Sequence, residues 1–154
     1  MHLRILAVGR LKDGPERVLC DDYIRRASPL ARGLGFRSVE ELEVPSGGGL
    51  DTEGRRLSEK IAPGVRAIRL DEHGEALSSE DFARRLAGWR DDGIPAAVFM
   101  IGGAEGYSDA LRRAVPATLA FGVQTWPHRL VRAMLAEQIY RAMTILAGTP
   151  YHKA

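Results

Sequence analysis

The sequence has little cysteine and no long apolar segment. Its only cysteine is Cys20, so an intramolecular disulfide is excluded, and we expect a structural thiol in a helix. No window approaches the roughly 18 consecutive apolar residues that a transmembrane helix needs. The apolar run at residues 3–8 is too short for a signal peptide, and Arg10 and Lys12 follow it directly. We therefore expect a cytoplasmic protein that does not enter a membrane.

Lysine is scarce, and the overall charge is nearly balanced. Only Lys12, Lys60 and Lys153 among the 22 basic residues are lysines, and the others are arginines, which suit phosphate contacts and base stacking. Codon bias explains the arginines equally well, because the chain is also rich in alanine and glycine. The formal net charge is +2, so charge alone does not indicate an RNA-binding protein. With 45% hydrophobic and 27% charged residues, the chain is typical of one soluble globular domain spanning residues 1–154.

Apolar runs of strand length alternate with longer amphipathic stretches. Strands are predicted at residues 3–8, 36–44, 65–70, 96–101 and 117–121. Helices are predicted at about 15–32, at 51–61, after Ser78 or Ser79, after Ser108, and at about 129–147. The continuous apolar run at 96–101 is typical of a central strand that is covered on both faces. This alternation predicts an α/β fold, a doubly wound and mostly parallel sheet with helices on both faces.

Two segments follow predicted strands at the edge where ligands of such sheets bind. Gly102 and Gly103 come directly after the buried run, and they allow a sharp turn and a close approach to a ligand. Neither a dinucleotide fingerprint nor a P-loop is present there. The stretch at 121–128 is irregular up to Pro127, so its free backbone groups could read the edge of an adenine. An ordinary turn and an ordinary connection remain the alternatives for these two segments.

The C-terminal tail brings an aromatic ring, an imidazole and a cation together in Tyr151, His152 and Lys153. Such a group is a plausible contact for an unstacked RNA base. Termini commonly fray, whereas Pro150 and Tyr151 indicate that this tail is docked.

These segments, taken in chain order, resemble one known family. The resemblance is carried by LAVG at 6–9, YIRR at 23–26, IGGAEG at 101–106, PHRLVR at 127–132, EQIYRA at 137–142 and PYHK at 150–153. Over nearly its whole length the chain resembles the ribosomal RNA large-subunit methyltransferase H family, which is one of the SPOUT methyltransferases. The resemblance implies methylation of N3 of a pseudouridine in a 23S rRNA hairpin loop of the ribosome, with S-adenosylmethionine as the cofactor and without a metal. It also implies a C-terminal trefoil knot and a homodimer.

The resemblance also implies roles for individual residues. Cofactor binding is expected at Leu70, Gly102, Gly103, Phe121, Gly122, Val123, Gln124, Thr125 and Trp126. RNA binding is expected at Arg132, Tyr151, His152 and Lys153, with the tail acting across the dimer. The candidates for the base that removes the N3 proton are, in order, His152, His128 and Glu105. Ala104, Trp126 and Arg129 depart from the Pro, Leu and Pro that are common in the family.

Three other functions remain open at this stage. The same fold could act on another RNA, such as a tRNA. A non-enzymatic RNA-binding module would keep the arginines and the tail, but it would not need the turn at Gly102 and Gly103. A flavodoxin-like enzyme for small molecules would need the phosphate-binding fingerprint that the sequence lacks.

Overall fold

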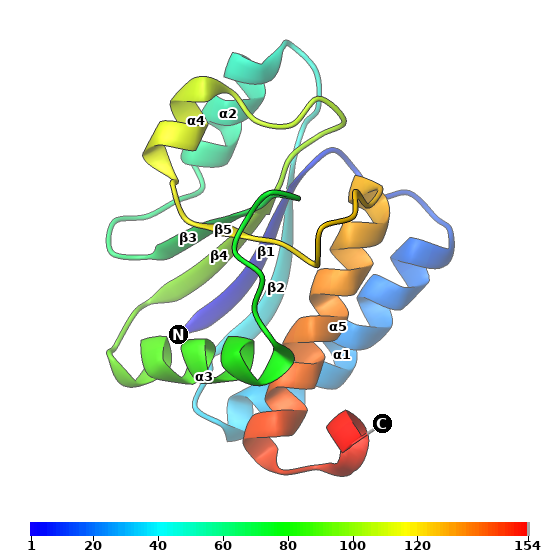
Figure 1. Cartoon of the computed structure of the whole chain (residues 1–154), viewed down its shortest axis with the longest axis vertical. Helices are drawn as coiled ribbons and strands as arrows, with labels where there is room; N and C mark the ends of the chain where they lie inside the picture. Colours follow the sequence, from blue (N-terminus) through cyan, green and yellow to red (C-terminus); the bar gives the residue numbers. More distant parts are fainter. Residues whose placement is uncertain (154) are drawn as a thin grey trace.

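The computed structural model of the chain is a parallel sheet flanked by helices (Figure 1). It describes residues 1–153, and the side chains of residues 1–151. The strands are β1 (His2–Val8), β2 (Ser38–Val44), β3 (Arg66–Leu70), β4 (Ala96–Ile101) and β5 (Thr118–Leu119). The helices are α1 (Pro15–Gly33), α2 (Leu50–Ser58), α3 (Ser79–Asp91), α4 (Asp109–Ala114) and α5 (His128–Ala147), followed by the 3₁₀ turn η1 (Pro150–Lys153).

The strands pair in the order β2-β1-β4-β3-β5, and every pair is parallel. All six residues of β4 are buried, as expected for a central strand that is covered on both faces. The strand predicted at 117–121 is shorter than expected, because β5 pairs with β3 only at Thr118 and Leu119, and a bridge from Ala120 to Ala76 continues it. The prediction of a mostly parallel α/β sheet is confirmed.

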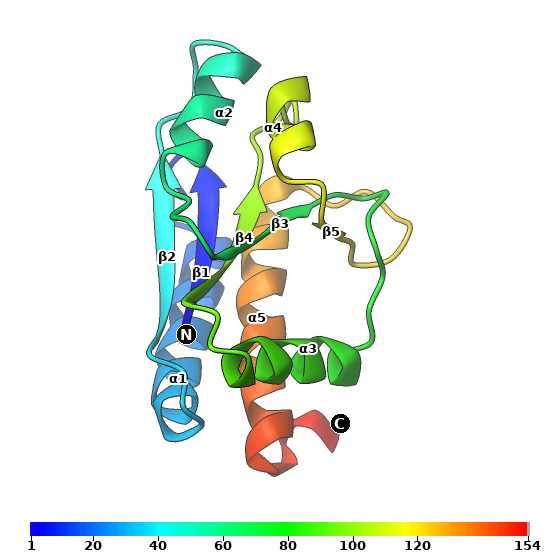
Figure 2. The ribbon, with the colours of Figure 1, turned by 90° about the vertical axis from the view of Figure 1, so that its left-hand side faces the viewer.

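Helices cover both faces of the sheet (Figure 2). Consecutive residues of a strand point to opposite faces, so Ile5 packs in the core beneath α1, α3 and α5, whereas Leu6 packs beneath α2 and α4. The prediction of a doubly wound sheet is therefore confirmed. The trefoil knot remains a prediction.

Local sequence signals set the ends of several helices. Pro15 begins α1, where its fixed φ suits the first helical position. The hydroxyl of Ser78 accepts the backbone N–H of Asp81 at 3.0 Å and caps α3, and Ser108 caps α4 in the same way through Leu111. These caps confirm the helix starts predicted at Ser78 and Ser108.

The connections that leave the strands open a crevice on each side of β4. The chain leaves β1, β3 and β5 toward the face that α1, α3 and α5 cover, but it leaves β4 toward the face that α4 covers. Where neighbouring connections turn to opposite faces, a crevice forms beyond the carboxyl ends of the strands. The fold thus offers a binding place on each side of β4, one between β4 and β3 and one between β4 and β1, and the boundary between β1 and β2, which lead to opposite faces, is a third.

Among the described residues, no helix is both long enough and apolar enough to span a membrane.

Candidate active site

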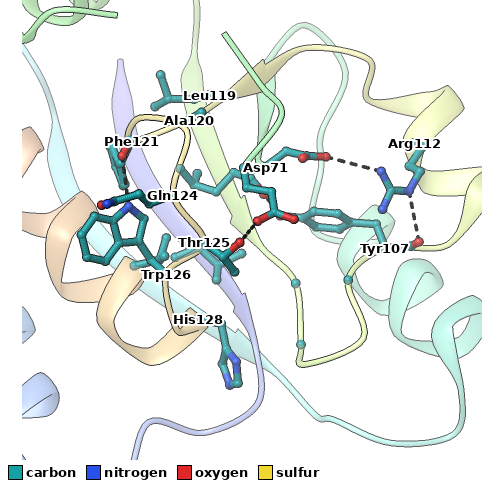
Figure 3. Close-up of a pocket in the computed structure, with 17 residues that line it drawn as sticks. Asp71, Tyr107, Arg112, Leu119, Ala120, Phe121, Gln124, Thr125, Trp126 and His128 are labelled. Atoms are coloured by element: carbon teal, nitrogen blue, oxygen red, sulfur yellow. Dashed lines mark hydrogen bonds and ion pairs between the residues drawn. The ribbon is translucent and has the colours of Figure 1, made fainter. Parts of the chain in front are cut away.

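A cavity of about 220 Å³ opens at the carboxyl ends of β3, β4 and β5 (Figure 3). Of the residues expected to bind a cofactor, those that line it are Leu70, Gly102, Gly103, Phe121, Gln124, Thr125 and Trp126. Gly122 and Val123 do not line it, and Val123 is 97% exposed. The structure thus brings together Leu70, the turn at Gly102 and the loop from Phe121, which lie about 30 and 20 residues apart in the sequence. They meet because parallel strands have their carboxyl ends at the same edge of the sheet.

The turn after β4 is tight because the chain itself crowds Gly102. A Cβ at this position would lie 2.8 Å from the carbonyl oxygen of Gly106 and 3.1 Å from the Tyr107 ring. The turn is closed by the backbone N–H of Gly106, which donates to the carbonyl of Gly103 at 3.0 Å. The prediction of a sharp turn is therefore confirmed, and glycine is required there by backbone contact within the turn.

Tyr107 is a structural part of the pocket that the sequence analysis missed. Its hydroxyl lies 2.8 Å from the carbonyl oxygen of Leu70 and 2.9 Å from that of Met100, so it bridges the ends of β3 and β4. Burial raises the pKa of Tyr107, which keeps the hydroxyl protonated. The guanidinium of Arg69 lies over the ring at 5.2 Å. An aromatic residue directly after a glycine turn was the only signal for this role.

Two carboxylates at the end of β3 were also missed as site residues. Asp71 accepts the backbone N–H of His73 at 3.0 Å and the guanidinium groups of Arg69 and Arg112 at 3.2 and 3.4 Å. The hydrogen bond from the His73 N–H has the largest effect on the pKa of Asp71 and lowers it. The positive charges of Arg112 and Arg69 lower it further, whereas partial burial opposes the shift. Asp71 therefore stays ionised at neutral pH. Glu72 follows it and also lines the cavity, as does Arg112, so this wall carries charges of both signs.

The loop between β5 and α5 is held by two side-chain hydrogen bonds (Figure 3). The indole N–H of Trp126 donates to the carbonyl oxygen of Phe121 at 3.0 Å and so joins the two ends of the loop. The hydroxyl of Thr125 donates to Glu72, which ties the loop to the segment after β3. The departure from leucine at Trp126 thus adds a hydrogen bond that leucine could not make.

Two of the three candidate bases come together beside the pocket. His128 lines both the cavity and a second groove, and Glu105 lines that same groove. The His128 ring points away from Trp126 (Figure 3). The side chain of His152, the third candidate, lies outside the described residues, as does that of Lys153. In the described part of the chain, no three His, Cys, Asp or Glu side chains are grouped as metal ligands.

Arg132 has a different environment from the one expected for an RNA contact. Its side chain is 3% exposed, pairs with Glu41 at 3.1 Å and with Glu43, and donates to the carbonyl oxygen of Gly9 at 3.0 Å. Although partial burial opposes it, the Leu11 N–H and the Arg132 guanidinium lower the pKa of Glu43. This burial is contrary to the prediction, because a phosphate cannot reach a guanidinium enclosed by two carboxylates. Arg132 instead fixes the start of α5 against β1 and β2.

Cys20 is buried beside the same ion cluster. Burial and the nearby Glu41 carboxylate raise the pKa of the Cys20 thiol to about 12. The thiol is therefore neutral and unreactive at physiological pH, which agrees with the structural role expected for it.

The tail follows the C-terminal end of α5 (Figure 1), whereas His128, which lines the cavity, is the first residue of that helix. The Tyr151 ring packs edge-on against Tyr140, with centroids 4.6 Å apart, and its hydroxyl donates to Glu137 at 3.0 Å. The prediction of a docked tail is thus confirmed for Tyr151. Since α5 has 20 residues at a rise of about 1.5 Å each, Tyr151 lies roughly 30 Å from His128 along the helix. Within one chain, Tyr151 therefore lies far from the cavity.

Comparison with known proteins places the chain in a family. A model of the family described as "Predicted SPOUT methyltransferase" matches residues 1–152. A protein of Hyphomonas neptunium named ribosomal RNA large subunit methyltransferase H is 72% identical over 154 residues, which cover 100% of both chains. A protein of Cereibacter sphaeroides with the same name is 50% identical over 155 residues, covering 99% of both.

The solved structures that are similar to the chain are more distant. One is the SpoU methyltransferase AviRb from Streptomyces viridochromogenes in complex with AdoMet, with 15% identity, a TM-score of 0.42 and coverage of 90% of this chain and 56% of that one. A similarity this low carries no argument about the site. The family model and the full-length relatives confirm the resemblance seen in the sequence: the chain belongs to the SPOUT methyltransferase family.

Proposed function

We propose that this protein transfers a methyl group from S-adenosylmethionine to N3 of a pseudouridine in the 23S rRNA of the large ribosomal subunit. The observation that carries the proposal is the cavity beyond β3, β4 and β5, because seven of the nine residues that the family resemblance assigns to the cofactor line it. The name shared by the full-length relatives supports ribosomal RNA as the substrate. We expect the protein to work in the cytoplasm, where ribosomes are found.

The residues of the cavity fit this cofactor by their chemistry. An adenine ring needs apolar walls, which Leu119, Phe121 and Val131 supply, and its polar edge needs backbone groups such as those of the loop at 121–126. The carboxylates of Asp71 and Glu72 suit ribose hydroxyls and the ammonium group of the cofactor's amino acid. When bound, S-adenosylmethionine supplies a methyl group activated by a positively charged sulfur.

The protein must orient the target nitrogen and remove its proton. Methylation of N3 would exchange the donor's S–CH₃ bond for an N3–CH₃ bond, leaving a neutral thioether, and it also breaks the N3–H bond, so the released proton needs an acceptor. His128 and Glu105 both line the groove beside Gly103 and can accept it there. The tail residue His152 is the third candidate. Holding N3 of the target nucleotide in line with the methyl group supplies most of the rate acceleration, as expected for a proximity-driven transfer.

The active unit that we propose is a homodimer. The distance of roughly 30 Å between His128 and the docked tail supports it, because a tail that acts at the reacting base must then come from a second chain. Apolar side chains remain exposed on α1, where Val18 and Leu19 are 67% and 42% exposed, and Leu130 and Met134 of α5 are only half-buried. Such surface suits burial between two copies.

The reaction is tested with labelled S-adenosylmethionine and ribosomes that lack the modification, followed by nucleoside analysis of the large-subunit rRNA. We expect 3-methylpseudouridine. If calorimetry shows that S-adenosylmethionine binds but this RNA is not methylated, the substrate is another RNA, such as a tRNA. Absence of cofactor binding would leave a non-enzymatic RNA-binding module.

The dimer is tested by mixing two inactive variants. Gly102→Val disables the pocket, and His152→Ala disables the tail. If the tail acts across the dimer, half of the molecules in a refolded equimolar mixture are heterodimers with one intact composite site, so about a quarter of the wild-type activity returns. If the tail acts on the pocket of its own chain, no activity returns. A single monomeric species in analytical ultracentrifugation would contradict the dimer directly.

A further inference from the structure

The cofactor pocket occupies only one of the two crevices beside β4. On the other side, between β4 and β1, lies a groove of about 730 Å³. Its walls are the loop after β1, the loop between β2 and α2, the turn after β4 and the start of α5. The residues along these walls include Arg10, Lys12, Gly47, Gly103, His128 and Arg129.

The groove is continuous with the pocket at two residues. Gly103 and His128 line both hollows, one at the turn after β4 and the other at the first residue of α5. A group bound in the groove therefore lies next to a ligand bound in the pocket. This is the arrangement that a transfer between two molecules requires, since donor and acceptor must meet without either entering the other's site.

The rim of the groove is positively charged. Arg10 and Lys12 are exposed, and neither has a carboxylate within 4.0 Å among the side chains that the structure describes. Arg129 lies 3.9 Å from Glu16 and is half-exposed. Such cations gain most from a polyanion that crosses the rim.

Two carboxylates, those of Glu53 and Glu105, also line the groove. Glu53 accepts the backbone N–H of Gly47 at 2.8 Å and so holds the glycine loop. Glu105 is exposed on the turn beside Gly103, near the junction with the pocket. Cations at the rim and a proton acceptor at the junction match the two parts of a nucleotide, its phosphate and its base.

The loop between β2 and α2 leaves one wall of the groove open. Gly47 and Gly49 carry no side chain, and the loop is fixed from behind by Arg56, which donates to the carbonyl oxygens of Pro45 and Gly47 at 2.8 Å each. A wall made of backbone lets a phosphodiester chain approach closely.

We propose that this groove binds the single-stranded RNA on which the target nucleotide lies, with Arg10, Lys12 and Arg129 at its phosphates and the target base at the junction of Gly103 and His128. The inference rests on the proposed function and adds to it the path of the substrate. RNA is favoured over a protein partner because the rim offers cations and no apolar anchor, whereas protein interfaces depend on buried apolar or aromatic residues.

The test uses the full-length protein saturated with S-adenosylmethionine and a fluorescent single-stranded oligoribonucleotide. The variant Arg10→Gln/Lys12→Gln is compared with Arg113→Gln/Lys60→Gln, which makes the same changes at exposed residues outside the groove. We expect the groove variant to raise the Kd about tenfold, and to reduce the slope of log K against log salt by about 1.4, as two lost phosphate contacts require. The control should keep the wild-type values, and both variants should bind S-adenosylmethionine normally.

Equal losses in the two double variants, or no loss in either, would overturn the groove as the RNA site. The outcome is separable from that of the proposed reaction. If the salt slope depends on the groove but no 3-methylpseudouridine forms, the groove stands and the reaction assigned above is wrong. If 3-methylpseudouridine forms and the groove variant has an unchanged KM for ribosomes, the reaction stands and the groove inference is wrong.

Discussion

The two ends of α5 differ in how firmly they hold the chain that adjoins them. At the first end, the loop before α5 is secured by the Trp126 and Thr125 hydrogen bonds, and Val123 is 97% exposed. At the other end, Tyr151 packs against Tyr140, and Arg26 and Arg141 lie over its ring at 5.6 and 5.0 Å. The end that carries the cavity is lightly held, whereas the end that carries the tail is densely packed.

This difference follows from what each end has to do under the proposed function. A loop that closes over a cofactor must open to release it, so it belongs to the part of the molecule with low local stability. A tail that serves the site of another chain must be presented in a fixed position, which rings and cations provide. Between the two ends, the buried side chains Leu135, Ile139 and Met143 hold α5 in the core.

The largest effect is expected at the ion cluster that fixes the start of α5. Arg132→Met removes the closest cation from Glu43 and leaves Glu41 paired with Arg17 alone, and it should lower the free energy of unfolding by about 3 kcal/mol. Chemical denaturation at pH 7 measures this loss. Arg25→Met, at an exposed ion pair of α1, is the matched control and should change stability by less than about 0.5 kcal/mol. Equal effects would contradict a special role for the cluster.

The same pair of variants predicts a pH dependence. The pKa of Glu43 is lowered in the folded protein, so its contribution to stability is present above its ordinary value of 4.5 and is lost as the pH falls through the folded pKa. Because Arg132→Met removes the partner, its deficit relative to the wild type should shrink below about pH 4.5. A deficit that stays constant from pH 7 to pH 3 would argue against this origin.

The next effect is expected at the glycine turn of the cavity. Gly102→Ala places a Cβ 2.8 Å from a backbone oxygen, which the turn can accommodate only by shifting. We expect the affinity for S-adenosylmethionine to fall about 30-fold, or about 2 kcal/mol, measured by calorimetry. Gly88→Ala, in α3, adds the same methyl group with no atom within 4 Å and should leave the affinity unchanged.

A smaller effect is expected at the loop before α5. Trp126→Phe keeps an aromatic ring but removes the N–H that bonds to Phe121, so the affinity for S-adenosylmethionine should fall about fivefold, the value of one hydrogen bond of about 1 kcal/mol. The melting temperature should hardly change, because the loop is exposed. An unchanged affinity would mean that the indole hydrogen bond does not order the loop for binding.

The smallest effect is expected at the tail. Tyr151→Phe keeps the packing against Tyr140 and loses only the hydroxyl bond to Glu137, so the free energy of unfolding should fall by about 0.5 kcal/mol. Cofactor affinity should stay at the wild-type value, because the tail lies at the far end of α5. A loss of cofactor affinity here would abolish the contrast between the two ends.

The sequence predicted most of the framework because its signals are local. The apolar run at 96–101, the serines at 78 and 108, and the glycine pair at 102–103 each act through contacts within a few residues, and all match the structure. The family was also predicted from the sequence, because the chain carries the family's motifs in the family's order.

What the sequence missed depends on contacts between distant residues. Arg132 looked like an RNA contact until the fold placed it against Glu41 and Glu43, about 90 residues earlier in the chain. Tyr107 and Asp71 gave no periodic signal, because their roles arise only where β3 and β4 end side by side. Burial of a polar group is a property of tertiary packing, and no local pattern reveals it.

The chain carries two tryptophans, and their different positions allow ligand binding to be followed by intrinsic fluorescence. Trp89 is partly buried against the core on α3, whereas Trp126 lies 37% exposed at the mouth of the cavity. A molecule that fills the cavity must change the polarity around the indole of Trp126 but not around that of Trp89. Occupancy of the pocket can therefore be followed by intrinsic emission, without a label, in the same protein whose chemistry is being measured.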